Sequence, residues 1–472
     1  MVFSSLIFLF VFFPIILAGY YLIKDDYRNY FLLLASLIFY AWGEPVYVLL
    51  MLFSILANYG FGLLVAGGRS KSISKFYVGL SLVFNLGLLG VFKYTGFIMS
   101  NINSLFGLDI PYPSLQLPLG ISFFTFQALS YVIDVYRNDA KVQKNLFNLA
   151  LYIALFPQLV AGPIVRYQSV ADQMVSRSHT VEKFGEGVKR FMQGMGKKVL
   201  IANPLGSVAD TVFVIPPDEI SVATSWIAII AYSLQIYFDF SGYSDMAIGL
   251  GKMFGFDFLE NFNYPYISQS VSEFWRRWHI SLGSWFREYV YIPLGGNRVG
   301  PIRVYFNLFV VWMLTGFWHG AAWNFVAWGL YFGILIGLEK AFVLKLLSKV
   351  YRPIRHLYLI IAVIIGWIFF RASSFGYGID YMKSMIGANS NQLYDNLTYV
   401  FLNDYGVLLL VGLVLSTPVL KWLVGYIMDR KPALLENSVF YISNSLVYGV
   451  MFLVIVVKLV NSTYNPFLYF RF

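Results

Sequence analysis

Cysteine is absent from the 472-residue sequence. Its absence excludes disulfides, thiolate metal ligands, a cysteine nucleophile and palmitoylation, and it leaves the redox compartment undetermined. Charged residues are scarce as well, at 12% of the chain against about a quarter in an ordinary soluble domain. Hydrophobic residues make up 58% and are spread along the whole length. These proportions indicate one polytopic helical membrane domain and argue against several soluble domains.

The sequence also lacks the common catalytic signatures. It contains no Walker loop, no GxSxG, no HExxH and no cysteine–histidine metal spacing, so no metal and no bound cofactor is predicted. A net charge of +10 does not indicate nucleic-acid binding, because lysine and arginine lie mostly in short loops between apolar runs. Basic residues in such loops set the orientation of membrane helices and contact anionic lipid headgroups.

The apolar runs predict an all-α polytopic membrane protein with about eleven transmembrane helices. Breaks near residues 157–163 predict a kinked or re-entrant segment. Residues 181–200 have apolar side chains at helical spacing and a basic opposite face, which includes Lys198. This pattern predicts an amphipathic helix, either on an anionic membrane surface or packed on its own loops. We expect one domain over residues 1–472, with N-terminal helices (1–165), a basic amphipathic cytoplasmic segment (166–200), a catalytic core (220–342) and C-terminal helices (355–472).

One histidine stands alone in a long apolar run. Residues 304–338 carry a single ionisable side chain, His319. As one helix this run would be about 52 Å long, so it must break, most readily at the glycines of residues 316–320. Ionisable groups inside membrane segments usually face a cavity or partner, and histidine exchanges protons near neutral pH. His319 is therefore a candidate catalytic base; the alternative is an interfacial histidine in an aromatic belt.

Residues 261–303 form a basic, aromatic stretch that we call the island. Its centre, Trp275-Arg-Arg-Trp-His279, places two guanidinium groups between indoles and an imidazole directly after them. Guanidinium groups bind phosphate and carboxylate, so the island is a candidate site for an anionic donor such as a coenzyme A thioester. The alternative is a set of interfacial anchors. Asp239 and Asp245, which follow an apolar run, are predicted to pair with the island's arginines.

Three segments resemble the membrane-bound O-acyltransferase family. They are residues 237–256 (YFDFSGYSDMAIGLGKMFGF), residues 260–298, which include FWRRWHISLGSWFREYVYIPLGGNR, and residues 316–329 (GFWHGAAWNFVAWG). The N-terminal MVFSS, PLGISFFTFQALSYVIDVYR and FPQLVAGPIVRY are similar to the family as well, so the resemblance covers almost the whole chain. Within the family, the chain resembles the bacterial branch that contains the membrane subunit of alginate O-acetylation.

The resemblance implies a ring of tilted helices around a tunnel that crosses the bacterial inner membrane. It places the family's near-invariant histidine at His319 and the second common histidine at His279. The implied reaction moves an acetyl group from a cytoplasmic donor, acetyl-CoA, to an extracytoplasmic partner acetyltransferase that modifies a polysaccharide. Alternatives are D-alanyl transfer from a carrier protein, lysophospholipid acylation, or transport of a polysaccharide or lipid. The candidate donor- and tunnel-binding residues are Trp275, Arg276, Arg277, Trp278, Asn297, Arg298, Trp318, Asp239, Ser241, Tyr243 and Asp245.

Overall fold

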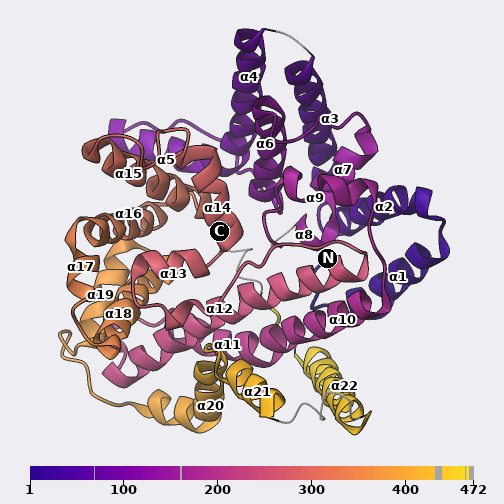
Figure 1. Cartoon of the computed structure of the whole chain (residues 1–472). Helices are drawn as coiled ribbons and strands as arrows, with labels where there is room; N and C mark the ends of the chain where they lie inside the picture. The colour runs from indigo at the N-terminus through magenta and orange to yellow at the C-terminus, as the bar shows by residue number, and fades with distance from the viewer. Residues whose placement is uncertain (68–69, 160–161, 431–437, 463, 467–472) are drawn as a thin grey trace. The chain divides into compact units, whose positions relative to one another are not determined.

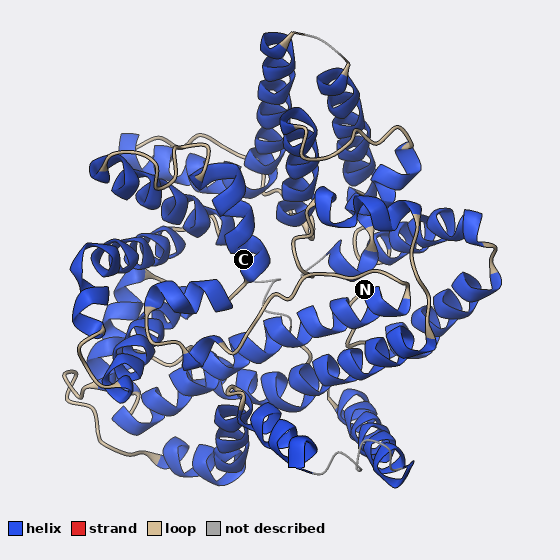
Figure 2. Cartoon of the chain, in the orientation of Figure 1, coloured by secondary structure: helices blue, strands red, loops and turns tan. Residues whose placement is uncertain are grey.

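The computed structural model describes every residue except 68–69, 160–161, 431–437, 463 and 467–472. Within these described ranges the chain is helical and has no β-strand, which confirms the predicted all-α class (Figures 1 and 2). Among the described residues, five stretches are long and apolar enough to cross a membrane. They are Tyr47–Ala66, Lys71–Phe106, Arg352–Arg371, Asn396–Leu415 and Ile442–Asn461. The total of about eleven transmembrane helices stays a prediction.

The helices form two compact units, and helices α10 and α12 contribute residues to both. Unit 1 comprises Met1–Phe191, Ser244–Glu260 and Arg287–Tyr289, and unit 2 comprises Met192–Tyr243, Asn261–Phe286 and Val290–Phe472. The elements that begin in unit 1 are α1 (Phe13–Leu22), α2 (Arg28–Ala41), α3 (Tyr47–Ala66), α4 (Lys71–Leu89), α5 (Thr95–Phe106), α6 (Ile121–Arg137), α7 (Leu146–Ala154), α8 (Phe156–Leu159), α9 (Tyr167–Val175) and α10 (Val181–Gly196).

Helix α6 is the buried centre of unit 1. Nearly all its side chains are buried, as expected for a helix that is apolar around most of its circumference. The break predicted near residues 157–163 is confirmed in part. Helix α7 ends at Ala154, Leu155 is not helical, and the short α8 follows. Ala161 of the predicted break lies outside the described residues.

The remaining helices begin in unit 2, and they include those that carry or flank His279 and His319. They are α11 (Asn203–Val212), α12 (Val222–Met253), α13 (Val271–Arg277), α14 (Ile280–Phe286), α15 (Pro301–His319), α16 (Trp323–Leu338), α17 (Leu344–Leu347), α18 (Arg352–Arg371), α19 (Phe375–Met385), α20 (Asn396–Leu415), α21 (Val419–Arg430) and α22 (Ser438–Asn461).

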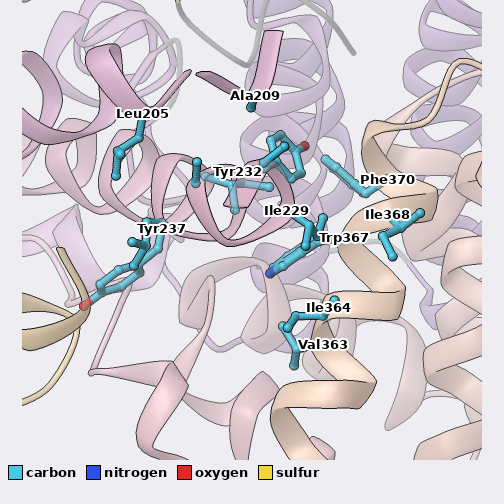
Figure 3. Packing of buried hydrophobic residues seen from close by; sticks show 14 of the residues in the cluster. Leu205, Ala209, Ile229, Tyr232, Tyr237, Val363, Ile364, Trp367, Ile368 and Phe370 are labelled. Atoms are coloured by element: carbon cyan, nitrogen blue, oxygen red, sulfur yellow. The ribbon is translucent and has the colours of Figure 1, made fainter. Parts of the chain in front are cut away.

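Side chains from α11, α12 and α18 interlock in the core of unit 2 (Figure 3). Trp367 of α18 is 1% exposed, and its indole nitrogen donates to the hydroxyl of Tyr266 at 3.1 Å. Tyr266 donates in turn to the carbonyl of Ser233 at 2.5 Å. The core therefore buries aromatic rings and gives the polar tips of these two a partner, as low-dielectric surroundings require.

The predicted helix at residues 181–200 is present as α10, which continues as a π-helix over Lys197–Ala202. It packs closely on α12 through glycines. A Cβ at Gly187 would lie 2.7 Å from the carbonyl oxygen of Gly249, and a Cβ at Gly242 would lie 2.8 Å from that of Gly194. Small residues at these positions let the two helix backbones approach closely.

Candidate active site

The apolar run of residues 304–338 breaks where its length predicted. Helix α15 ends at His319, and α16 begins at Trp323. The two helices pack backbone against backbone, because a Cβ at Gly316 would lie 2.4 Å from the carbonyl oxygen of Phe325. A Cβ at Gly329 would likewise lie 2.4 Å from the carbonyl oxygen of Trp312. This tight hairpin fixes His319 at the end of α15.

Aromatic rings surround the His319 side chain, which is 8% exposed. The ring centroids of Trp318 and Trp328 both lie 5.0 Å from its imidazole, and that of Phe370 lies 5.2 Å away. All three rings stand nearly perpendicular to the imidazole. Residues from α15, α16 and α18 thus hold this histidine in one orientation and shield it from bulk water.

His279 lies in the same aromatic cluster. Its imidazole centroid is 6.0 Å from that of Trp318, so Trp318 contacts both histidines. The side chain is 4% exposed, and its Nδ1 has no hydrogen-bond partner among the described residues. His279 lies outside the five candidate spans, and burial lowers the pKa of its imidazole to about 3. The imidazole is therefore neutral at physiological pH.

A strained turn between α13 and α14 holds His279 in place. His279 has a φ of +46°, a conformation that few residues other than glycine adopt. The buried Asn261 braces this turn: its carbonyl accepts from the Ile280 amide at 2.9 Å. Its side-chain oxygen accepts from the Ser281 amide at 3.1 Å. Sequence reasoning missed this role for Asn261, because an asparagine in a loop has many ordinary explanations.

Helix α13 is fixed at its N-terminus by two side chains. Ser270 caps the helix by accepting from the Glu273 amide at 3.1 Å. The carboxylate of Glu339, 1% exposed, accepts from the amides of Val271 at 2.6 Å and Ser272 at 2.8 Å. A carboxylate at this end also favours the helix dipole. Glu339 was not predicted from sequence, since its partners lie 67 and 68 residues earlier in the chain.

The island's tryptophans belong to the aromatic cluster. The ring of Trp275 lies 5.0 Å from that of Trp312 and 5.4 Å from that of Trp328, measured between centroids. Trp278, 5% exposed, lies 4.9 Å from Trp367. The structure therefore brings Trp275, Trp278 and Trp318 together with the two histidines.

The island's cations differ in their surroundings. Arg277 pairs with Glu273 one helical turn away, at 3.0 Å, and it also donates to a backbone carbonyl. Arg276 and Arg298 are exposed. The side-chain oxygen of Asn297 accepts from Tyr291 at 2.8 Å and from Lys340 at 2.5 Å, so Lys340 adds a cation that the sequence did not point to.

The predicted pairing of Asp239 and Asp245 with the island's arginines is wrong. Asp239 pairs with Lys198 at 2.5 Å, and Asp245 pairs with Arg190 at 2.7 Å. The physical reason is that α12 continues through these residues to Met253 and packs on α10, whose cations are the nearest ones. Lys198 is 2% exposed, so its predicted place on the exposed basic face is also wrong. Ser241 and Tyr243 are buried on the same stretch of α12.

Comparison with known proteins gives the family. Residues 139–376 match the model of the MBOAT, membrane-bound O-acyltransferase, family. The protein named probable alginate O-acetylase AlgI from Pseudomonas aeruginosa is 44% identical over 88% of this chain and 81% of its own length. Its Azotobacter vinelandii namesake is 40% identical over 100% of both chains. The peptidoglycan O-acetyltransferase of Helicobacter pylori is 35% identical over 83% of this chain and 81% of its own.

These matches cover the segments that carry His279, His319 and the aromatic cluster. They agree with the motifs quoted from the sequence and with the apolar helices long enough to cross a membrane. The chain belongs to the membrane-bound O-acyltransferase family and is a multi-pass membrane O-acetyltransferase.

Proposed function

We propose that this enzyme transfers an acetyl group from cytoplasmic acetyl-CoA, through the bacterial inner membrane, toward hydroxyl groups of an extracytoplasmic polysaccharide. An extracytoplasmic partner acetyltransferase completes the transfer. The names of the relatives support the acceptor class, because alginate and peptidoglycan are both polymers with sugar hydroxyls. We therefore propose a polysaccharide with free hydroxyl groups as the acceptor of this enzyme.

The observation that carries the proposal is the placement of His319. It ends α15 at a glycine-bordered break, is enclosed by Trp318, Trp328 and Phe370, and shares Trp318 with His279. A histidine at a break between two apolar helices can meet reactants that enter from either membrane face. A tunnel through this point would let donor and acceptor react without moving coenzyme A across the bilayer.

The reaction follows from general base catalysis. The neutral imidazole of His319 takes the proton of the acceptor hydroxyl while its oxygen adds to the thioester carbonyl carbon. The tetrahedral intermediate then collapses, the carbon–sulfur bond breaks, and the thiolate receives the proton from His319. The products are an acetyl ester and a free thiol. His279, buried and neutral, is a supporting polar group in the same cluster.

The donor side is proposed to use the exposed cations Arg276 and Arg298, with Lys340 next to Asn297. Guanidinium and ammonium groups attract the phosphates of a nucleotide donor. Arg277 is a weaker candidate, because its guanidinium is already paired with Glu273. The aromatic cluster would then receive the short acyl end of the donor.

The test is to replace His319 by alanine and to measure polymer-bound acetate in cells that contain equal amounts of membrane-inserted protein. A lost general base predicts a decrease of about 10²- to 10⁴-fold. His179→Ala is the matched control, because His179 is a partly buried histidine of unit 1 that bonds to Tyr20 at 2.7 Å. Unchanged acetylation in His319→Ala would remove this residue from the reaction.

A second experiment separates transfer from transport. Purified protein is incubated with acetyl-CoA labelled in the acetyl group, and thioester consumption is measured with and without the partner protein. Consumption that depends on His319 supports the proposed donor. A protein that exports polymer without acyl-donor dependence would be a transporter instead.

A further inference from the structure

Two tryptophans of the aromatic cluster around His319 have buried indole nitrogens without a hydrogen-bond partner among the described residues. They are Trp275 of α13 and Trp328 of α16. Two other indole N–H groups of unit 2 have protein partners: Trp367 donates to Tyr266 at 3.1 Å, and Trp226 donates to the carbonyl of Met385 at 3.0 Å. A buried donor without an acceptor is unfavourable and needs an explanation.

The two donors are close to one another and to the reacting centre. The rings of Trp275 and Trp328 lie 5.4 Å apart and stand at 85° to each other. Trp328, 1% exposed, contacts the His319 ring at 5.0 Å. Both donors are therefore within two ring contacts of the proposed base.

Rigid elements carry both rings. The carboxylate of Glu339 binds the first amides of α13, which positions Trp275. Gly329, next to Trp328, holds α16 against the backbone of α15. Donors held in this way need no rearrangement when charge develops beside them, which is the requirement for stabilising an oxyanion.

We propose that the indole N–H groups of Trp275 and Trp328 bind the carbonyl oxygen of the acyl group. This inference rests on the proposed acetyl transfer. When the acceptor oxygen adds to the carbonyl carbon, the π electrons of the carbonyl move onto its oxygen, and the two N–H groups donate hydrogen bonds to it. The electrons return when the carbon–sulfur bond breaks. The indoles keep their protons throughout.

A purely structural role is the competing explanation. Trp275 also makes edge-to-face contacts with Phe332 at 4.9 Å and with Trp312 at 5.0 Å, so an N–H group could point at a ring face. In that case each indole would contribute to packing alone. The two roles predict different kinetics.

The first test compares Trp328→Phe and Trp275→Phe with Trp367→Phe in cells, by the initial rate of polymer acetylation at equal protein levels. All three changes remove an indole N–H and shrink a ring, but the Trp367 N–H already has a protein partner. We expect decreases of about 10²-fold for Trp328→Phe and at least tenfold for Trp275→Phe. Trp367→Phe should stay within about threefold of wild type. Equal rates for Trp328→Phe and Trp367→Phe would overturn the inference.

A shape-conserving replacement guards against misfolding. Benzothienylalanine at position 328 keeps the bicyclic ring and replaces the N–H by sulfur. It should reproduce the loss caused by Trp328→Phe while leaving the midpoint of thermal unfolding near that of wild type. Wild-type acetylation in this variant would contradict the inference. These rates are measured in cells, so they decide the indole role even if the donor is not acetyl-CoA.

Carbonyl infrared spectroscopy gives a readout that packing does not affect. Acetyl-CoA labelled with ¹³C at the carbonyl is bound, without acceptor, to His319→Ala protein, which turns it over about 10²- to 10⁴-fold more slowly than wild type. Two N–H donors should lower the carbonyl stretching frequency relative to free acetyl-CoA. The shift should shrink in His319→Ala/Trp328→Phe and persist in His319→Ala/Trp367→Phe. Coincident bands in these two double variants would count against the indoles, whereas absence of any bound band would count against the proposed donor.

Discussion

Two helical hairpins of this protein are held together by different contacts: side-chain hydrogen bonds in one and close backbone packing at glycines in the other. In unit 1, α3 and α4 are joined by side-chain amides: Asn58 donates to Asn85 at 3.0 Å, and Asn85 donates back to Asn58 at 2.8 Å. Their second N–H groups donate to the carbonyls of Ser54 and Ser81. In unit 2, α15 and α16 meet through the backbone at Gly316 and Gly329.

The difference separates structural polar groups from those available to a ligand. Both asparagines of the α3–α4 hairpin are at most 1% exposed, and all their amide N–H groups are satisfied within the hairpin. Around the α15–α16 hairpin, the Nε1 of Trp328 and the Nδ1 of His279 are buried and have no partner among the described residues. Helix association by glycine leaves such atoms free to bind a substrate.

The largest expected effect comes from Gly329→Ala. Its Cβ would meet the carbonyl oxygen of Trp312 at 2.4 Å, so the backbones of α15 and α16 must separate. We expect a loss of about 3 kcal/mol in the free energy of unfolding and a loss of activity. Gly337→Ala is the control on the same helix, because its Cβ would make an ordinary 3.7 Å contact with Tyr305. Reversible unfolding in mixed micelles measures the free energy of unfolding of both variants. Equal losses in the two would show that the close approach at Gly329 is unimportant.

The second prediction concerns His279 and pH. Its pKa is about 3 in the folded protein and about 6.5 when unfolded, so below pH 6.5 the unfolded chain binds a proton that the folded protein does not. This residue should therefore destabilise the fold as pH falls from 6.5 toward 3, by roughly 2 kcal/mol at pH 5. As the pH falls, the midpoint of thermal unfolding should therefore decline less steeply in His279→Gln than in wild type. Parallel profiles for the two proteins would contradict the low pKa.

The third prediction tests whether Asn58 and Asn85 serve only to stabilise the α3–α4 hairpin. Asn85→Leu removes one partner and leaves buried amide groups of Asn58 unsatisfied, which should destabilise the protein by about 1 to 2 kcal/mol. Asn58→Leu/Asn85→Leu removes both amides and should cost less than the sum of the single changes. The turnover number of the folded fraction should stay unchanged in Asn58→Leu, in Asn85→Leu and in the double variant. A specific fall in turnover would assign this hairpin a part in catalysis.

The position of His319 at a helix break was predictable from sequence, because the thickness of a membrane limits the length of a straight helix. A run of 35 residues cannot cross a membrane as one straight helix, and this predicted the break beside His319. The support of the site was not predictable in the same way. Asn261 and Glu339 act on residues far along the chain, and nothing in their local sequence records those contacts. The pairing of Asp239 was predicted wrongly because the packing of α12 on α10 is a tertiary fact.

The smallest expected effect concerns the exposed cations beside the α15–α16 hairpin. Arg298 lies in the turn before α15, where Asn307 donates to the carbonyls of Leu294 and Gly296. An exposed cation near a phosphate contributes at most about 1 kcal/mol, so Arg298→Gln should raise KM for acetyl-CoA about three- to fivefold without lowering kcat. Lys345→Gln, an exposed cation of α17, is the control.

Salt distinguishes this surface attraction from the buried hydrogen bonds of the site. Raising ionic strength from 50 to 300 mM should shrink the difference in KM between Arg298→Gln and wild type, since the screening length falls from about 14 Å to about 6 Å over this range. The decrease in rate caused by Trp328→Phe should not change over the same range, because a buried indole N–H acts at contact and carries no net charge. If the rise in KM of Arg298→Gln and the decrease in rate of Trp328→Phe respond equally to salt, Trp328 acts through donor recruitment like Arg298. The distinction between surface cations and buried donors would then be wrong.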